Sequence, residues 1–336
     1  MDETQEDEWI PPPEQQPVEP IRPLVQEARW TSTPLAAQLL TDSNAFYADW
    51  SPLHLQPPYA IYHYTDGAGL KGVLETGRLW ASDMLYFDGS REVSYTYGLI
   101  REQLRNRWSA TDTVLADFCV QAEAALDPRR WARSLFTACF CADGDSLTQW
   151  RTHAGDGGYA VGLRTATLEG VGVRFQRAAL RRVIYSAEHQ NAAIRELLDR
   201  AVAVVRAAGS GTADERAGTL AIVLEFLTDH MIEFVASFKR PTFRQEAEWR
   251  LVVVLDTGYA GEGAGQVYFR VAHGHPVPYV ELDVSPRGGP GAAPVAEVVC
   301  GPIELGELAA RSIQILLKSR GHAGIRVRNS ALTLPG

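Results

Sequence analysis

YAIYHYTDGAGLKGVLETGRLWAS, residues 59–82, is the stretch that decides the fold. Its first part, YAIYHYT, predicts a strand with His63 at its middle, and its last part, RLWAS, predicts a second strand. Between them LKGVLETG predicts a helix that ends at Gly77. Apolar residues recur there with helical spacing at Leu70, Val73 and Leu74. We expect the imidazole of His63, on a strand covered by this helix, to line a small-molecule pocket.

The composition is that of a globular protein. The chain has 336 residues, of which 46% are hydrophobic and 22% charged, so it has room for one large or two modest domains. The net charge of −9 disfavours sequence-independent binding of nucleic acid. Because no run of about 18 apolar residues occurs, we expect no membrane span and a cytoplasmic protein.

The four cysteines are too few and too irregularly spaced for a disulfide framework, which agrees with a reducing compartment. Cys139 and Cys141 lie on a predicted strand, and we expect them to point to opposite faces and to be small buried side chains. They therefore make poor partners for one metal ion or one disulfide.

Composition divides the chain into three parts. Residues 1–24 are acidic and proline-rich and predict a disordered head, and residues 25–58 predict a helical lead-in. Residues 59–336 predict a single α+β domain of catalytic type, with a curved mixed or antiparallel sheet as its core and flanking helices. A dinucleotide-binding doubly wound fold is disfavoured, because no strand is followed by GxGxxG and no GxxxxGK[ST] occurs. Helices are expected at residues 92–108, 113–126, 187–207 and 213–236, and a strand at 134–141.

The segment FRQEAEWRLVVV brings charged residues to the start of an apolar strand. Glu246 and Glu248 are two residues apart and are expected to share one face of the strand, with Arg244 and Arg250 near enough to pair with them. Charges entering an apolar strand are costly unless they are paired, at its end or functional. This pattern is compatible with two interpretations to the same degree: a set of ion pairs at the end of a strand, or a pair of catalytic carboxylates.

Other candidate groups are weaker when taken one at a time. Gln149 and Trp150 precede a glycine-rich turn at 155–158 that allows close approach of a ligand. A lone histidine such as His63 is more often structural than catalytic, and the other histidines lack the spacing of metal ligands, so no metal is expected. Asp88 and Glu92 flank a turn and either face the same pocket or cap the following helix.

Together these segments resemble a bacterial family known as domain of unknown function 2971 (DUF2971). The resemblance extends over about residues 59–333 and depends on the order and spacing of five segments, each of them weak alone. They are residues 59–82, 85–92 (LYFDGSRE), 146–163 (SLTQWRTHAGDGGYAVGL), 237–252 (SFKRPTFRQEAEWRLV) and 298–332. Membership of such a family implies no activity by itself.

The order of a strand histidine, a helix, a glycine and a late-strand glutamate is more distantly similar to ADP-ribosyltransferases, including those that modify DNA or RNA. This resemblance implies an ADP-ribosyltransferase-like fold and NAD as the substrate. His63 then binds the nicotinamide-side ribose, and Glu248, with Glu246 as the alternative, stabilises the cation that forms when nicotinamide leaves. The remaining positions expected to bind NAD are Tyr64, Thr65, Gln149, Trp150, Tyr159 and Arg250.

The function expected from this resemblance is an NAD-dependent ADP-ribosyltransferase or NAD glycohydrolase-like enzyme, of the kind found among bacterial toxins and phage-defence effectors. Its acceptor, protein or nucleic acid, stays open, and an antitoxin or another partner from the same operon is compatible with it. Two other functions stay open: a metal-dependent nuclease or hydrolase that uses Glu246, Glu248, Asp88 or Glu92, and a non-catalytic module that senses a nucleotide.

Overall fold

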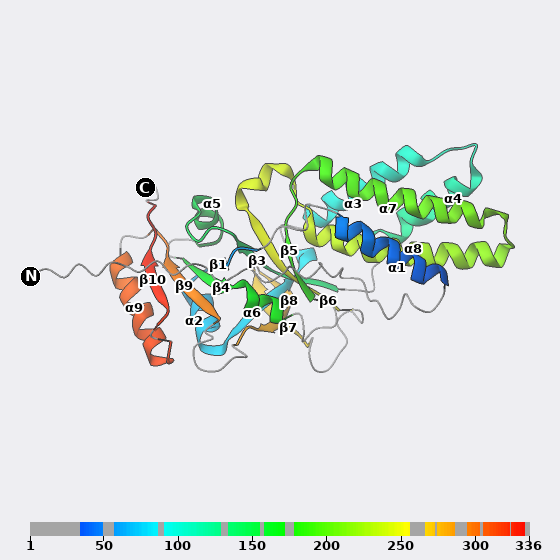
Figure 1. Ribbon diagram of the computed structural model, residues 1–336. Coiled ribbons are helices and arrows are strands. Elements are labelled where there is room, and N and C mark those ends of the chain that lie inside the picture. The colour runs from blue at the N-terminus through cyan, green and yellow to red at the C-terminus, as the bar shows by residue number, and fades with distance from the viewer. Residues whose placement is uncertain are drawn as a thin grey trace, which may run out of the picture.

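The structure is a computed structural model. It describes residues 34–49, 57–86, 91–128, 134–154, 158–171, 178–255, 266–272, 274–285, 294–302, 305–322 and 324–332. A mixed sheet occupies the middle of the molecule, with a bundle of helices at one end and α9 at the other (Figure 1). The predicted head, residues 1–24, lies outside the described residues, as does Asp88.

The longer helices are α1 (Pro34–Asp49), α2 (Gly67–Thr76), α3 (Arg91–Arg107), α4 (Thr113–Ala125), α6 (Thr165–Val171), α7 (Ala187–Ala207), α8 (Ala213–Ser237) and α9 (Gly306–Ser319). Shorter turns are α5 (Leu147–Gln149), a π-helical turn (Trp150–Ala154), and the 3-10 helices Ala208–Ser210 and η8 (Pro241–Glu246). None of the helices in the described part of the chain combines the length and apolar character needed to cross a bilayer.

The strands are β1 (Ala60–Thr65), β2 (Arg78–Asp83), β3 (Ser134–Cys141), β4 (Tyr159–Arg164), β5 (Ala178–Arg182), β6 (Glu248–Leu255), β7 (Val267–Ala272), β8 (His275–Asp283), β9 (Val295–Cys300) and β10 (Arg326–Asn329). They form one sheet in the order β10-β9-β4-β1-β3-β2-β8-β7, and β6 joins it between β3 and β5. The β9–β10 pair is parallel and the other described pairs are antiparallel.

The sheet divides at β3. β6 pairs with β3 along its whole length, from Ser134 to Cys141, and therefore occupies one edge of that strand. β1 and β2 share the other edge: β1 pairs at Cys141 and β2 pairs at Phe136 and Thr137. A gap between β1 and β2 consequently lies beside the middle of β3, and α2 connects the two strands.

Alternation along β3 and β6 separates two hydrophobic cores. Leu135, Val252 and Val254 pack with α3, α4, α7 and α8. Their neighbours Phe136 and Val253 pack on the opposite face of the sheet, with α2 and α9. This alternation is what a strand buried on both faces produces, since successive side chains point in opposite directions. The expected α+β class, with a mixed sheet and flanking helices, is confirmed.

The predicted helix between the first two strands is confirmed as α2, and so is its end at Gly77. Asp66 caps the N-terminus by accepting a hydrogen bond from Gly69 N–H at 2.7 Å, and Gly77 has a left-handed φ of 64° at the C-terminus. Leu70, Val73 and Leu74 are buried, as their spacing predicts. The helix thus begins and ends where its own sequence directs, next to the strand that carries His63.

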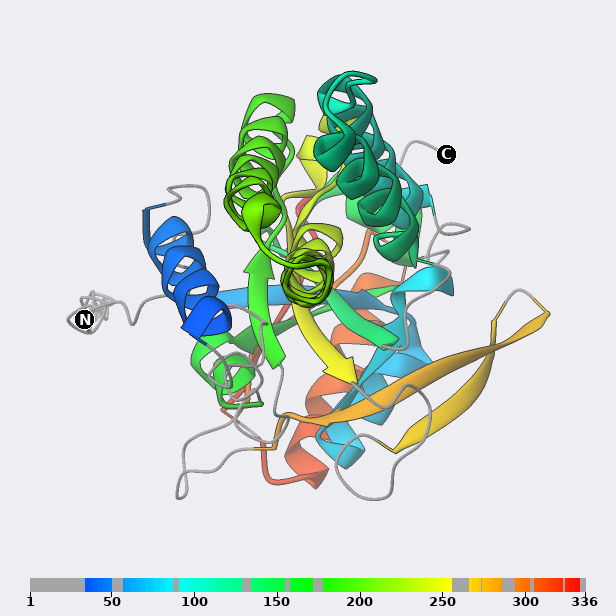
Figure 2. The ribbon, with the colours of Figure 1, turned by 90° about the vertical axis from the view of Figure 1, so that its right-hand side faces the viewer.

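The β7–β8 hairpin extends beyond the rest of the sheet (Figure 2). β8 pairs with β2 only from Tyr279 to Asp283, whereas its first residues pair with β7 alone. β7 is therefore an edge strand, and Phe269 and Val271 on it are exposed.

Candidate active site around Glu248

Glu248 begins β6 directly after a tight turn. η8 ends at Glu246, and the next residue, Ala247, has a φ of 43°, the one positive value of a non-glycine residue in the described ranges. This left-handed conformation is unfavourable for a residue with a Cβ. A hydrogen bond of 3.1 Å from Ala142 N–H to the Ala247 carbonyl joins the turn to the end of β3. The turn therefore fixes where the Glu248 side chain enters the sheet.

Glu246 and Glu248 do not share a strand face, and this part of the prediction is wrong. Glu246 ends η8, and the strand begins only at Glu248. Both carboxylates nevertheless reach one cation, since Lys239 Nζ lies 2.5 Å from Glu246 Oε2 and 2.9 Å from Glu248 Oε2. Arg244, the second arginine expected to pair with them, is exposed and is not one of their ion-pair partners among the described residues.

Arg250 makes the second set of contacts to Glu248, as predicted. Its Nε lies 2.8 Å from Glu248 Oε1 and its Nη2 lies 3.1 Å from Oε2, which is a two-point contact. Glu92, from the first turn of α3, lies 2.5 Å from Arg250 Nη2 and 3.0 Å from Lys239 Nζ. We call these five residues the Glu248 cluster: Glu92, Lys239, Glu246, Glu248 and Arg250.

The cluster sets the charge of its members. Burial alone would raise the pKa of Glu248, but the positive charges of Arg250 and Lys239 outweigh burial and lower the pKa to about 2. Glu246 behaves differently, because burial raises the pKa of its carboxyl although Lys239 acts against it. With three carboxylates and two cations, the ionised cluster carries one net negative charge.

His63 lies across β3 from this cluster. Tyr62 and Glu248 both pair with Cys141, from opposite edges of β3, so the two outer strands are roughly 10 Å apart at this level. The Nδ1 atom of His63 lies 3.0 Å from the Cys139 carbonyl. Burial lowers the pKa of His63, so the ring is neutral at pH 7. Because a carbonyl only accepts, Nδ1 carries the proton and Nε2 is the acceptor.

Tyr64 and Trp150 pack against each other rather than lining an open site. Their rings lie 4.6 Å apart, edge to face, and both side chains are buried. The hydroxyl of Tyr64 donates to the Asp143 carbonyl at 2.8 Å and accepts from Ser146 N–H at 2.9 Å. The pair therefore anchors the segment between β3 and α5. Gln149 extends this support, since its Nε2 donates to the Glu246 carbonyl at 3.3 Å.

Thr65 and Tyr159 lie farther along the sheet. They are direct partners at the end of the β1–β4 pair, and both are half-buried. The structure thus brings together Glu248, Glu246 and Arg250, with Gln149 behind them and His63 across β3. Among the described residues, Thr65, Tyr159, Tyr64 and Trp150 make no hydrogen bond to the Glu248 carboxylate.

The expectation that Cys139 and Cys141 point to opposite faces is also wrong. They are two residues apart on one strand, so they share a face, and they pair with Arg250 and Glu248 respectively. Burial raises the pKa of both thiols, with the negative charge of Glu248 adding to the effect at Cys139. Both cysteines are free, and Cys141 is buried.

Three residues near Glu248 were not found from the sequence. Lys239 follows α8, and Tyr185 accepts a hydrogen bond of 3.1 Å from Glu248 N–H. His153, on the π-helical turn, interacts electrostatically with Glu248, His63 and Lys239. A lysine directly after the apolar end of a helix was the available signal for Lys239. Nothing in the local sequence pointed to Tyr185.

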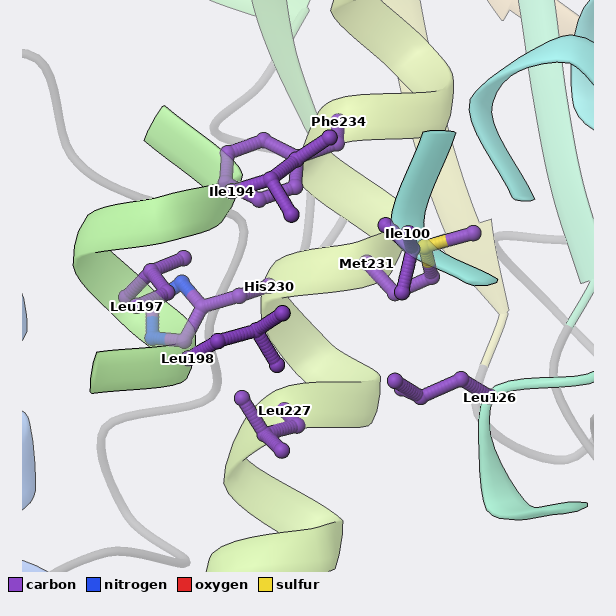
Figure 3. A pocket seen from close by; sticks show the side chains of 9 residues that line it. All are labelled: Ile100, Leu126, Ile194, Leu197, Leu198, Leu227, His230, Met231 and Phe234. Carbon is purple, nitrogen blue, oxygen red and sulfur yellow. The ribbon is translucent and has the colours of Figure 1, made fainter. Parts of the chain in front are cut away.

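Two other features bear on what the molecule binds. In the described ranges no group of three or more histidine, cysteine, aspartate or glutamate residues is arranged to hold a metal ion. A cavity of about 10 Å³ lies in the bundle, between α3, α7 and α8, and Figure 3 shows its lining. Apart from His230 the lining is apolar, and the space is at most that of one water molecule. It is therefore a packing defect and no substrate site.

Comparison with known protein families gives a match to part of the chain. Residues 149–251 match the family "Protein of unknown function (DUF2971)". The DUF2971 match confirms the predicted resemblance over this part of the chain, and it contains Lys239, Glu246, Glu248 and Arg250, whereas His63 and Glu92 lie outside it. No curated protein and no solved structure matches the chain.

Proposed function

We propose that this protein breaks the bond between nicotinamide and ribose in NAD, and transfers the ADP-ribose to an acceptor or to water. In this reaction nicotinamide leaves with the bonding electron pair, and positive charge develops on the ribose. An acceptor nucleophile or water then forms a bond to the same ribose carbon. Glu248 is the residue assigned to stabilise the ribose cation, and His63 is assigned to bind the ribose.

The observation that carries the proposal is the position of these two residues on either side of β3. His63 and Glu248 are far apart in the sequence, yet the His63 ring binds the carbonyl of Cys139, and Cys139 pairs with Arg250, the arginine that contacts Glu248. Tyr62 shares the sheet face of Glu248, so the ring of His63, the next residue, reaches Cys139 from the other face of β1. The gap between β1 and β2 lies beside them. Nε2 of His63 is an acceptor without a hydrogen-bond partner among the described residues, and a ribose hydroxyl fits that role.

The electrostatics of the Glu248 cluster support the same chemistry. Because three carboxylates face two cations, its net negative charge favours a positive charge that forms nearby. The low pKa keeps Glu248 ionised at neutral pH. Its two-point contact with Arg250 also holds the carboxylate in one orientation before substrate binds. Such preorganised groups are typically worth about 10²-fold or more in rate.

The structure also favours a second reading, in which the cluster only stabilises the fold. Both oxygens of Glu248 already have cationic partners, as in a purely structural ion-pair network. Removing one partner of a buried pair costs about 3–5 kcal/mol in stability, whether or not the pair is catalytic. The test must therefore measure turnover separately from folding.

The test measures nicotinamide release from NAD by the purified chain, with chelator present and with cell lysate as a source of acceptor. We expect release by the wild type and a loss of about 10²-fold or more in Glu248→Gln. Glu233→Gln is the matched control. Glu233 is a buried carboxylate paired with Arg181 of β5, one strand farther from His63 than β6.

Rates are compared per folded molecule, below the melting temperature of each variant. A loss confined to Glu248→Gln supports the proposal. Equal rates in wild type and Glu248→Gln, or no release by folded wild type, contradict it, and reduced stability without any turnover selects the structural reading.

A further inference from the structure

An aromatic stack crosses three strands on the other side of the gap between β1 and β2. The ring of Trp80 on β2 stacks on Tyr279 of β8 at 4.4 Å, and Tyr279 stacks on Tyr268 of β7 at 5.6 Å. Tyr279 is largely buried, whereas Trp80 is 50% exposed. An outer face of the indole is therefore available to a flat ligand.

An arginine without a counter-ion lies beside this stack. Arg270 Nη2 donates to Ser82 Oγ at 3.1 Å, which brings the guanidinium across β8 to β2. Among the described residues Arg270 has no carboxylate partner, and its buried Nε atom has no hydrogen-bond partner. A half-buried cation and an unpaired donor are both costly, so this geometry favours an anionic ligand.

A second unpaired polar atom lies at the same point. Thr137 on β3 is directly opposite Ser82, and its buried hydroxyl has no partner in the described part of the chain. Residues opposite each other on antiparallel strands share a face, so Thr137, Ser82 and Tyr279 lie on one side of the sheet. The polar base and the aromatic stack therefore adjoin each other.

The site is continuous with the Glu248 region. Thr137, at the base of this face, lies on the same side of β3 as Cys139 and Cys141, which pair with Arg250 and Glu248. Trp80 and Ser82 are two residues apart on one strand, a spacing of about 6.6 Å. A nucleoside 5′-phosphate can bridge that spacing, with its base on Trp80 and its phosphate at Arg270.

We propose that the face formed by Trp80, Ser82, Tyr279 and Arg270 is a nucleotide-binding subsite, in which a base stacks on Trp80 and a phosphate accepts hydrogen bonds from Arg270. This subsite would give the β7–β8 hairpin a function, whereas the Glu248 cluster takes no residue from that hairpin. The choice of ADP as the ligand rests on the proposed function, since ADP is the half of NAD that remains when nicotinamide and its ribose are removed.

The experiment is calorimetric titration of the full chain with ADP, adenosine and pyrophosphate. We expect ADP to bind more tightly than either fragment. Arg270→Gln should weaken ADP about 10-fold or more, since a charge-assisted contact is lost. Trp80→Ala should weaken ADP and adenosine roughly 10-fold, which is typical of a lost base–aromatic stack.

Two controls match these variants. Phe269→Ala removes an aromatic ring that is more exposed than Trp80, one residue from Arg270 on β7 and hence on its opposite face. Arg320→Gln removes an arginine that pairs with Glu75 at the surface. Neither should change ADP affinity, and far-UV circular dichroism confirms that every variant is folded.

Failure of the subsite differs from failure of the proposed function. Glu248→Gln should lose NAD turnover and keep ADP binding if both proposals hold. ADP binding with no turnover by any variant supports the subsite and contradicts the reaction. ADP affinity unchanged in both Arg270→Gln and Trp80→Ala, or no ADP binding by folded wild type at millimolar concentration, overturns the subsite.

Discussion

Two buried ionisable residues show how the surroundings decide charge at the scale of single side chains. Glu248 lies among cations and stays ionised, with its pKa lowered to about 2. His230 lies in α8 among apolar side chains and against the ring of Phe226, and burial lowers its pKa to about 3. One residue keeps its charge because partners are close, and the other stays neutral because the bundle offers a charge too little solvation.

His230 makes stability depend on pH. Its pKa falls from an ordinary 6.5 to about 3 on folding, so between these values the unfolded chain binds the extra proton. The contribution of neutral His230 to the free energy of unfolding is complete above pH 6.5. It decreases by about 1.4 kcal/mol per pH unit as the pH falls toward 3. We expect urea unfolding at pH 7.5 and 5.0 to show a smaller pH effect in His230→Leu than in wild type. His189→Leu, which changes an exposed histidine of α7, should keep the wild-type effect. Equal pH effects in all three proteins would contradict this assignment.

Lys239 is the cation on which the carboxylates of the cluster depend most broadly, since it contacts Glu92, Glu246 and Glu248. Lys239→Met leaves Glu92 and Glu248 with Arg250, and leaves Glu246 without an ion-pair partner among the described residues. The pKa values of Glu246 and Glu248 should then rise, and stability at pH 7 should fall by about 3–5 kcal/mol. The deficit should shrink at pH 5, because protonated carboxylates no longer repel one another. Lys71→Met, which breaks an exposed pair with Glu75 on α2, should cost no more than about 0.5 kcal/mol. Urea unfolding at both pH values measures this, and a deficit that grows on acidification would refute the account.

At the scale of elements, local sequence was sufficient for the positions of several helices and strands, but not for α6 or for strand order. The strand at 134–141 and the helix at 187–207 were predicted with their observed bounds. The gap between β1 and β2 was not predicted, because it depends on which residues of β3 each strand pairs with. For the same reason the pairing of Glu248 with Arg250, two residues apart, was predictable, whereas its contact with Lys239 required knowledge of how α8 and η8 pack.

The capping of α2 gives a test of local control. Asp66 supplies the hydrogen bond to Gly69 N–H, and Asp66→Ala leaves that donor to water. We expect the free energy of unfolding to fall by about 1 kcal/mol, as for other N-cap losses. Asp66→Ser keeps an acceptor at the cap and should lose less. Chemical denaturation compares the three proteins, and an equal loss in both variants would show that the side-chain cap contributes nothing.

At the scale of the whole molecule, the bundle and one face of the sheet share a hydrophobic core. Residues of α8 such as Phe234 belong to the same buried cluster as Val252 and Val254 of β6. Phe234 also stacks on Phe238 at 4.8 Å. On either side of Phe238, the Ser237 carbonyl accepts a hydrogen bond from Ile184 N–H at 2.7 Å and Lys239 N–H donates to the Ile184 carbonyl at 3.2 Å, which connects the end of α8 to the strand region. If the helix bundle unfolded, the apolar side chains of β6 that pack against it would be exposed to water, and the reverse holds for the sheet. The bundle and the sheet should therefore unfold together.

Phe234→Ala tests this coupling. Removing a buried phenylalanine ring should cost about 3–5 kcal/mol, because contacts are lost and a cavity remains. Far-UV circular dichroism is dominated by the bundle helices, while Trp150 and Trp249 are buried within the sheet region and contribute to fluorescence. If the shared core couples the two parts, both signals should shift to the same lower urea midpoint. A dichroism transition that moves while the fluorescence transition stays at the wild-type midpoint would show that the bundle unfolds alone. In that case the Glu248 cluster, which takes Glu92 from α3 and Lys239 from the end of α8, would lose two of its members while the sheet remained folded.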